Sequence, residues 1–178
     1  MKQRRIAKRI AWAGGLAAVI YVAYGVVNLF LWNIQYSMGM EMYQRAEIVD
    51  QNSSTLLMGA APLFQKALAL NPHDSSSSSL LGRIRIREML DHLREGRHRE
   101  GLMSAREAAD YLVRAMRLSP AEAENRLLMG YLVNALNPYR PVPREVKHKY
   151  IDGALALSPN NARMLQNILT LYRYEADW

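Results

Sequence analysis

The sequence contains no cysteine, and this absence excludes several kinds of chemistry. Without thiols the chain cannot form a disulfide, a thiolate nucleophile, an iron–sulfur cluster or a covalent haem attachment. It also lacks a phosphate-binding loop, a nucleophile elbow and a zinc motif. The fold must therefore be held together by packing alone.

Acidic residues are absent from the first nine positions, where positive charge is concentrated. Residues 1–9 carry five Lys and Arg residues, and the other 18 of the 23 in the chain nearly balance the 16 Asp and Glu residues. Such a tail directs membrane insertion and attracts anionic lipids, whereas a nucleic-acid site needs a basic surface on the folded domain. We therefore expect no nucleic-acid partner.

Charge is also absent from residues 10–32, which read IAWAGGLAAVIYVAYGVVNLFLW. A helix of this length spans roughly 34 Å at about 1.5 Å per residue, enough to cross a hydrocarbon core of about 30 Å. Trp12 near one end, with Trp32 and Tyr36 at the other, fit the aromatic belts of membrane interfaces. The sequence predicts a transmembrane helix in contact with the lipid bilayer.

The flanks of this helix predict its orientation. Positive charge precedes the helix, and none follows it until Arg45, so the N-terminus should stay in the cytoplasm. A cleaved signal peptide is the alternative, but the apolar run is long for one and no small-x-small site follows it. We predict an uncleaved signal anchor with a cytoplasmic tail (1–9), a transmembrane helix (10–32) and an extracytoplasmic domain (33–178), most consistent with the periplasmic side of a bacterial inner membrane.

Small residues recur along the predicted transmembrane helix at helical spacing. A face of small side chains lets a second helix approach closely within lipid, so this face is a candidate contact for other subunits of a membrane complex. The alternative is that Ala and Gly are simply common in membrane helices. The face comprises Ala11, Gly14, Gly15, Ala18 and Gly25.

Two helices are predicted directly after the transmembrane segment. Residues 36–50 have helical i,i+4 pairs and can continue directly from the segment before them. Residues 55–70 form the second, with Pro62 expected to bend the helix or delay its start.

A sequence pattern then occurs three times. ALALNP at 67–72 returns as AMRLSP at 115–120 and as ALALSP at 154–159. Extended backward, the copies align a small or polar residue, a large apolar residue, an alanine and a proline: Ala60, Phe64, Ala67 and Pro72; Ala108, Leu112, Ala115 and Pro120; Lys147, Ile151, Ala154 and Pro159. Leu81-Gly82 and Met129-Gly130 follow the first two prolines at the same distance.

This pattern resembles the tetratricopeptide repeat, with its early Leu-Gly, its Ala-x3-Phe and its closing Pro. The proline spacings of 48 and 39 residues exceed the family's 34, and we place the extra residues in 94–103 and in the proline-rich 137–143. The resemblance implies an all-α fold: a single N-terminal transmembrane helix, then an irregular stack of about three helical hairpins, then a C-terminal capping helix over 161–174. Lys147 lacks the small side chain of its counterparts, so the third hairpin is expected to be splayed.

We find no candidate catalytic residues, metal ligands or cofactor site, and we predict that the protein is not an enzyme. None of the four histidines has a ligand set around it in the sequence. The arginine-rich run after residue 82 contains opposite charges four residues apart, at Arg87/Asp91 and Glu95/Arg99, as a solvated helix face would have.

The resemblance implies instead a concave groove for a partner protein. The positions that would face it are Arg83, Arg87, Tyr131, Asn134, Gln166, Thr170 and Arg173. Arginines there suit an extended segment or the acidic terminus of a partner. In layout the chain is similar to anchored periplasmic repeat proteins, such as translocon-associated chaperone accessories and repeat subunits of cytochrome c maturation.

We therefore expect an accessory, scaffold or assembly subunit of a membrane complex. Three alternatives remain open: a partner of a polysaccharide or protein export machine, a membrane-tethered enzyme or small-molecule-binding domain, and a lipid-surface protein whose basic tail carries the function.

Overall fold

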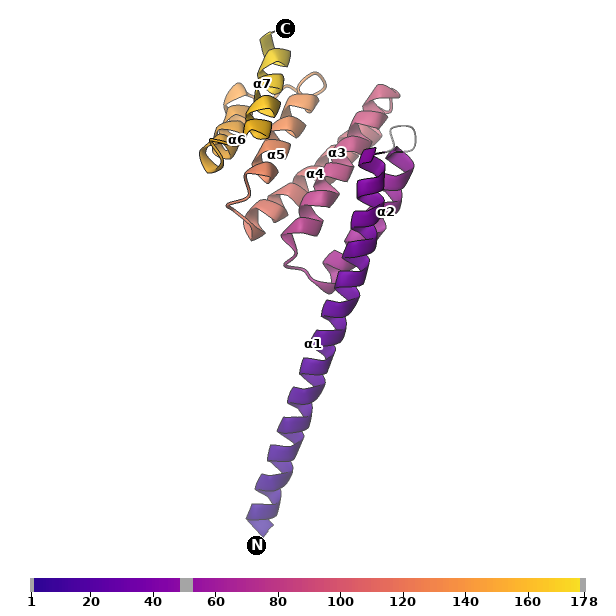
Figure 1. The fold of residues 1–178 in the computed structure, drawn as a ribbon, viewed down its shortest axis with the longest axis vertical. Coiled ribbons are helices and arrows are strands. Elements are labelled where there is room, and N and C mark those ends of the chain that lie inside the picture. The colour runs from indigo at the N-terminus through magenta and orange to yellow at the C-terminus, as the bar shows by residue number, and fades with distance from the viewer. Residues whose placement is uncertain (1, 49–52, 177–178) are drawn as a thin grey trace.

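The computed structural model describes residues 2–48 and 53–176, with side chains described for 12, 14–47 and 55–170. All regular structure in these residues is helical, which confirms the predicted all-α class. Figure 1 shows the helices, which are α1 (Lys2–Ile48), α2 (Ser53–Leu70), α3 (Ser75–Arg94), α4 (His98–Leu118), α5 (Ala123–Leu136), α6 (Arg144–Leu157) and α7 (Ala162–Ala176).

The predicted transmembrane segment and the helix expected after it form one unbroken helix, α1, of 47 residues. Its segment Gly14–Glu47 is long and apolar enough to cross a membrane, and the most apolar 18-residue window within it has no buried residues. Val19 and Phe30, for example, are 65% and 64% exposed. Figure 1 shows the N-terminal part of α1 projecting away from the other helices, so the apolar surface has no cover within the described chain.

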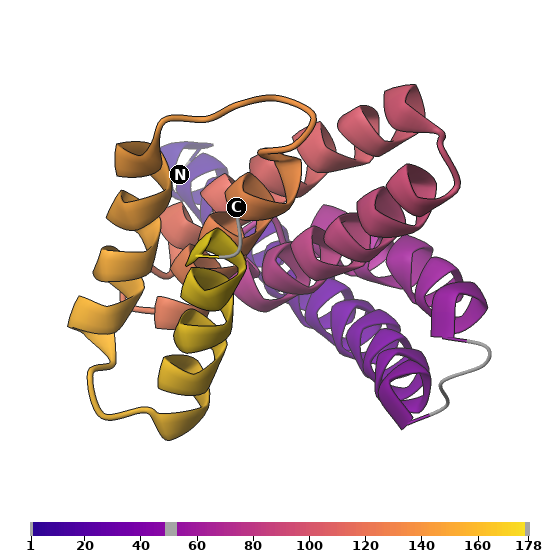
Figure 2. The ribbon, with the colours of Figure 1, turned by 90° about the horizontal axis from the view of Figure 1, so that it is seen from above.

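The helices pack in consecutive pairs. The C-terminal part of α1 lies against α2, α3 lies against α4, and α5 lies against α6, while α7 contacts α5 and α6. Seen from above in Figure 2, the pairs follow one another from α1 and α2 on the right to α6 and α7 on the left. The helix that leaves the apolar segment is therefore also the first helix of the folded domain.

A glycine at the crossing point allows each pair to approach closely. A Cβ atom on Gly39 of α1 would lie 2.9 Å from the Phe64 ring of α2. The same close approach relates Gly82 to Leu112, at 2.8 Å, and Gly130 to Ile151, at 2.9 Å. Since real Cβ atoms need more space, each pair requires glycine at this position unless its neighbour shifts.

The aligned residues of the three sequence copies form the centre of the packing. The three large residues Phe64, Leu112 and Ile151 are fully buried, as are the alanines that follow each of them. Each large residue belongs to a separate apolar cluster, which it shares with a helix of the next pair or with α7. The core is thus a row of three clusters along the helix pairs.

The structure bears on two local predictions. The segment 94–103 contains the end of α3 at Arg94, a short turn in which Gly96 has a φ of +75°, and the start of α4 at His98. α3 and α4 have 20 and 21 residues, against 14 in each of α5 and α6, so the extra residues lengthen the two helices on either side of this turn. Pro62 does not delay the start of α2, which begins at Ser53, nine residues earlier.

Lys147 occupies the crossing position of the third pair and is only 6% exposed. Its Nζ donates a hydrogen bond to Asn134 Oδ1 at 3.3 Å. Burial lowers the pKa of Lys147 below its ordinary value, and the nearby Arg144 lowers it further. The folded domain therefore holds a charged amine at a cost that the unfolded chain does not have.

This cost predicts how stability depends on pH. The unfolded chain keeps the Lys147 proton to higher pH than the folded chain, so stability should rise as pH increases through the lowered pKa toward the ordinary value. We expect Lys147→Met to stabilise the domain by about 1 kcal/mol at neutral pH and to reduce this rise. Urea denaturation of the full chain in detergent measures both, with the exposed neighbour as control in Lys149→Met. Equal behaviour of the two variants would contradict the prediction.

Candidate functional site

The first helices of the pairs, together with α7, line one groove. The groove has a volume of about 530 Å³ and takes Tyr43 from α1, Arg83 and Ile86 from α3, six residues of α5, and Asn167 and Thr170 from α7. α1, α3, α5 and α7 alternate along the chain with α2, α4 and α6. Side chains that are distant in sequence therefore converge on this surface. It is the candidate functional site.

An ion pair between Arg83 of α3 and Glu124 of α5 crosses the groove. The Tyr43 hydroxyl on α1 also interacts with Arg83. Burial alone would lower the pKa of Arg83, but Glu124 and Tyr43 together raise it above its ordinary value, so the guanidinium stays charged. For Tyr43, burial raises the pKa of the phenol despite the opposing effect of Arg83. Arg83 therefore connects three helices.

Four of the seven predicted groove residues meet in this groove: Arg83, Tyr131, Asn134 and Thr170. Gln166 is exposed on α7, and its backbone carbonyl accepts a hydrogen bond from Thr170 Oγ1 at 2.9 Å. Arg87 lies outside the lining and pairs with Asp91 on its own helix at 3.7 Å, as the sequence predicted. Arg173 lies outside the described side chains.

Among the described side chains, the groove is less basic than the sequence suggested. Arg83 is the arginine that the structure places in the lining, and Glu124 already neutralises it. A partner carboxylate would have to displace Glu124 to reach it. Glu95 and Arg99 are both exposed but do not share a helix face, because Glu95 lies in the α3–α4 turn, where it pairs with Arg97, and Arg99 lies in α4.

The apolar part of the groove was missed in the sequence. It consists of Ile86, Leu127, Leu128 and Ala135, which lie between the polar residues of α3, α5 and α7. Tyr43 was missed because residues 36–50 were predicted as a helix but were not assigned to a repeat as its groove-lining first helix. The dipeptide Met38-Gly39, which matches Leu81-Gly82 and Met129-Gly130, was the available signal.

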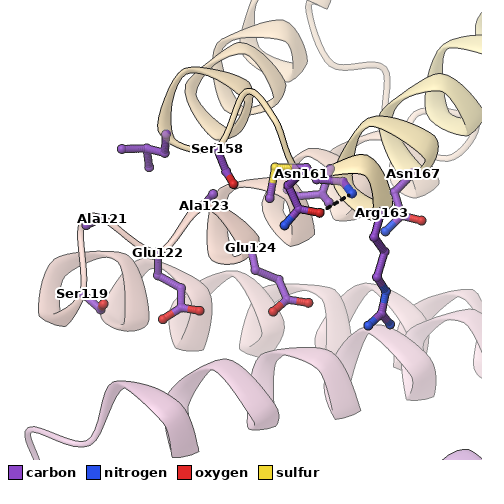
Figure 3. A pocket seen from close by; sticks show the side chains of 12 residues that line it. Ser119, Ala121, Glu122, Ala123, Glu124, Ser158, Asn161, Arg163 and Asn167 are labelled. Carbon is purple, nitrogen blue, oxygen red and sulfur yellow. Dashed lines mark hydrogen bonds between the residues drawn. The ribbon is translucent and has the colours of Figure 1, made fainter.

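A second pocket of about 510 Å³ adjoins the groove between the α4–α5 and α6–α7 turns. Both cavities share Glu124, Leu127 and Asn167. In Figure 3, the carboxylates of Glu122 and Glu124 project from one wall and the Arg163 side chain comes from α7 on the other side. Together the two cavities form an elongated surface with apolar and charged portions, which suits a chain segment better than a compact small molecule.

Metal binding has no support in the described side chains. Within them, no three His, Asp or Glu residues lie close enough together to hold an ion.

In α1, Gly14, Gly15 and Gly25 have open space around them and Ala18 is exposed, whereas the Ala11 side chain lies outside the described set. The small-residue face is thus free for lipid or for another helix.

No protein-family model matches this chain. No curated protein matches its sequence either.

Proposed function

We propose that this protein is a membrane-anchored protein-interaction module that serves as an accessory, scaffold or assembly subunit of a larger membrane complex. The observation that carries the proposal is the continuity of α1, whose exposed apolar part leads without interruption into the helix that contributes Tyr43 to the groove. A continuous helix has no flexible linker, so a partner in the groove would be held at a fixed position relative to the anchor. Such an arrangement suits a subunit that works beside other membrane proteins.

We further propose that the domain is an irregular stack of tetratricopeptide-like hairpins with α7 as its cap. The close approach of a glycine to a large buried residue in all three pairs supports this assignment. So does the alternation of groove-lining and outer helices, which is how repeat stacks form a concave surface. On this basis the C-terminal part of α1 is the first helix of the first repeat.

The proposed location is a bacterial inner membrane, with the tail in the cytoplasm and the helical domain on the periplasmic side. The five positive charges before the apolar segment support this orientation. The proposed partner contact is an extended or helical segment with both apolar and charged side chains, because the groove presents Ile86 and Leu128 beside the Arg83–Glu124 pair.

Site-specific photocrosslinking in the native membrane tests this assignment. A benzophenone amino acid replaces Tyr131, which lines the groove and is 40% exposed, or Tyr139, which is 46% exposed in the α5–α6 connection. We expect a discrete protein adduct from position 131 and none from the matched position 139. Adducts of equal yield from both positions, or from position 139 alone, would contradict the groove assignment.

Gentle detergent extraction of the full-length protein, followed by sizing and mass spectrometry, identifies the partner. A discrete larger assembly would support the accessory-subunit proposal and identify the process. A clean monomer or homodimer would overturn it as a stable-complex proposal and would favour the alternative of a tethered enzyme or small-molecule-binding domain.

A further inference from the structure

The outer end of the apolar part of α1 is joined directly to the folded domain. Trp32 is the last residue of the apolar segment 10–32, and its indole Nε1 donates a hydrogen bond to Asp74 Oδ2 at 2.9 Å. Asp74 belongs to the turn between α2 and α3, 42 residues further along the chain. Figure 1 shows this turn lying beside α1 as the part of the domain nearest to the N-terminal half of that helix.

Asp74 is buried and makes several further hydrogen bonds, so its bond to Trp32 fixes the position of the turn relative to α1. The residue is 8% exposed and caps α3, with Oδ1 accepting a hydrogen bond from the Ser76 backbone N–H at 3.0 Å. The Ser77 hydroxyl donates to Oδ2, and the Ser78 hydroxyl donates to the Asp74 carbonyl at 3.1 Å. The five-serine run at 75–79 thus helps to fix the carboxylate that receives the indole of Trp32.

Aromatic packing also joins this part of α1 to the folded domain. The Tyr36 ring stacks on the Trp32 ring at 5.6 Å and meets the Phe64 ring edge-on at 5.9 Å. Trp32 is therefore attached to α2 through Tyr36 and Phe64, and to α3 through Asp74. The α2–α3 turn is therefore held at the same height along α1 as Trp32.

Tryptophans at the ends of transmembrane helices lie at the headgroup level. If Trp32 lies there, the α2–α3 turn lies there also, and its outward groups face the lipid surface. Pro72 and His73 are exposed in this turn, the Asp74 carboxylate is buried, and Arg114 of α4 donates a hydrogen bond to the Pro72 carbonyl at 2.7 Å. Arg114 thus places a cation beside the exposed turn, which suits the phosphates of an anionic leaflet.

We propose that the α2–α3 turn, together with Arg114, is a lipid-contact surface that seats the domain on the phospholipid headgroup layer, with the Trp32–Asp74 hydrogen bond fixing the tilt. This inference depends on the membrane anchoring in the proposed function. A seated domain holds its groove at one height and one angle above the bilayer, so it can receive only a partner segment that emerges close to the membrane surface.

The absence of cysteine makes the test direct, since each single-cysteine variant can carry one spin label. His73→Cys reports on the turn, and Arg99→Cys is the matched control, because Arg99 is exposed near the start of α4, beyond the opposite end of α3. Both are measured in the full chain reconstituted into vesicles of phosphatidylethanolamine and phosphatidylglycerol, by the collision rates of the label with oxygen and with a water-soluble nickel complex. We expect a several-fold lower nickel collision rate at position 73 than at position 99.

A third label, in Val19→Cys, separates failure of this inference from failure of the anchor. A hydrocarbon depth at position 19 with a fully aqueous label at position 73 would overturn the lipid seat and leave the anchor intact. An aqueous label at position 19 would overturn both.

A second variant tests the hydrogen bond itself. Trp32→Phe keeps the aromatic ring and removes the donor, and we expect it to raise both the nickel collision rate and the mobility of the label at position 73. An unchanged label in Trp32→Phe would show that the bond does not fix the tilt and would overturn that part of the proposal.

Discussion

Phe64→Ala is expected to destabilise the domain by about 3 to 5 kcal/mol, the range found for complete removal of a buried aromatic side chain. Phe64 is fully buried, and its ring occupies the space left open by Gly39 at the crossing of α1 and α2. It also contacts the Tyr36 ring, which leads to Trp32. The substitution therefore weakens the packing between α1 and the rest of the fold.

The measurement is urea denaturation of the full chain in detergent, with Met58→Ala as the matched control. Met58 lies on the same helix and is 55% exposed, so its truncation should change stability by no more than about 0.5 kcal/mol. We also expect Phe64→Ala to reduce the crosslink from position 131, because Tyr43 is on α1 and loosening α1 disturbs the groove. A Phe64→Ala protein as stable as Met58→Ala would show that the first pair is not held in the way described.

The repeated sequence pattern predicted the core well because it reports on packing directly. A small or polar residue, a large one four residues further and an alanine three residues after that recur where helices cross, and the large residues Phe64, Leu112 and Ile151 are all fully buried. The apolar segment 10–32 was informative as well, because it forms part of one unbroken helix that is long and apolar enough to cross a membrane. Both features are local in sequence.

The groove was harder to predict because its organisation depends on contacts between distant residues. The Arg83–Glu124 pair joins positions 41 residues apart, and neither residue has a neighbour in sequence that indicates the other. The Trp32–Asp74 bond is similar, because Asp74 is recognisable as a helix cap while its second partner is not. The two glycines of the charged stretch after Leu93 have different roles that the sequence does not distinguish, because Gly96 lies in the turn with a φ of +75° whereas Gly101 is buried inside α4 against Leu93.

Removing four of the five positive charges of the tail is expected to change the orientation of the protein. With Arg4, Arg5, Lys8 and Arg9 replaced by Gln, one positive charge remains before the apolar segment, and one, Arg45, lies within the first turns after it. The bias that retains the tail in the cytoplasm then disappears. We expect a mixed population in which a large share of molecules place the helical domain on the cytoplasmic side.

A single cysteine in place of Met103, which is 58% exposed on α4 and lies outside the proposed lipid-contact surface, reports the orientation through its reaction with a maleimide that does not cross membranes. The matched control replaces four exposed basic residues of the domain by Gln, which changes the net charge equally but lies outside the flanks that direct insertion: Arg99, Arg106, Arg117 and Lys149. This control should keep the original orientation.

The same pair of variants distinguishes a tail that only directs membrane insertion from one that also binds lipid or a partner. If the tail only directs insertion, those molecules that keep the native orientation should still form the crosslink at position 131. If they keep the orientation and lose this crosslink, the tail acts on the lipid surface or on a cytoplasmic partner. The hypothesis of a lipid-surface protein whose basic tail carries the function then replaces the accessory-subunit proposal. The two results differ because orientation is set once, at insertion, whereas lipid or partner binding by Arg4, Arg5, Lys8 and Arg9 must persist in the mature protein.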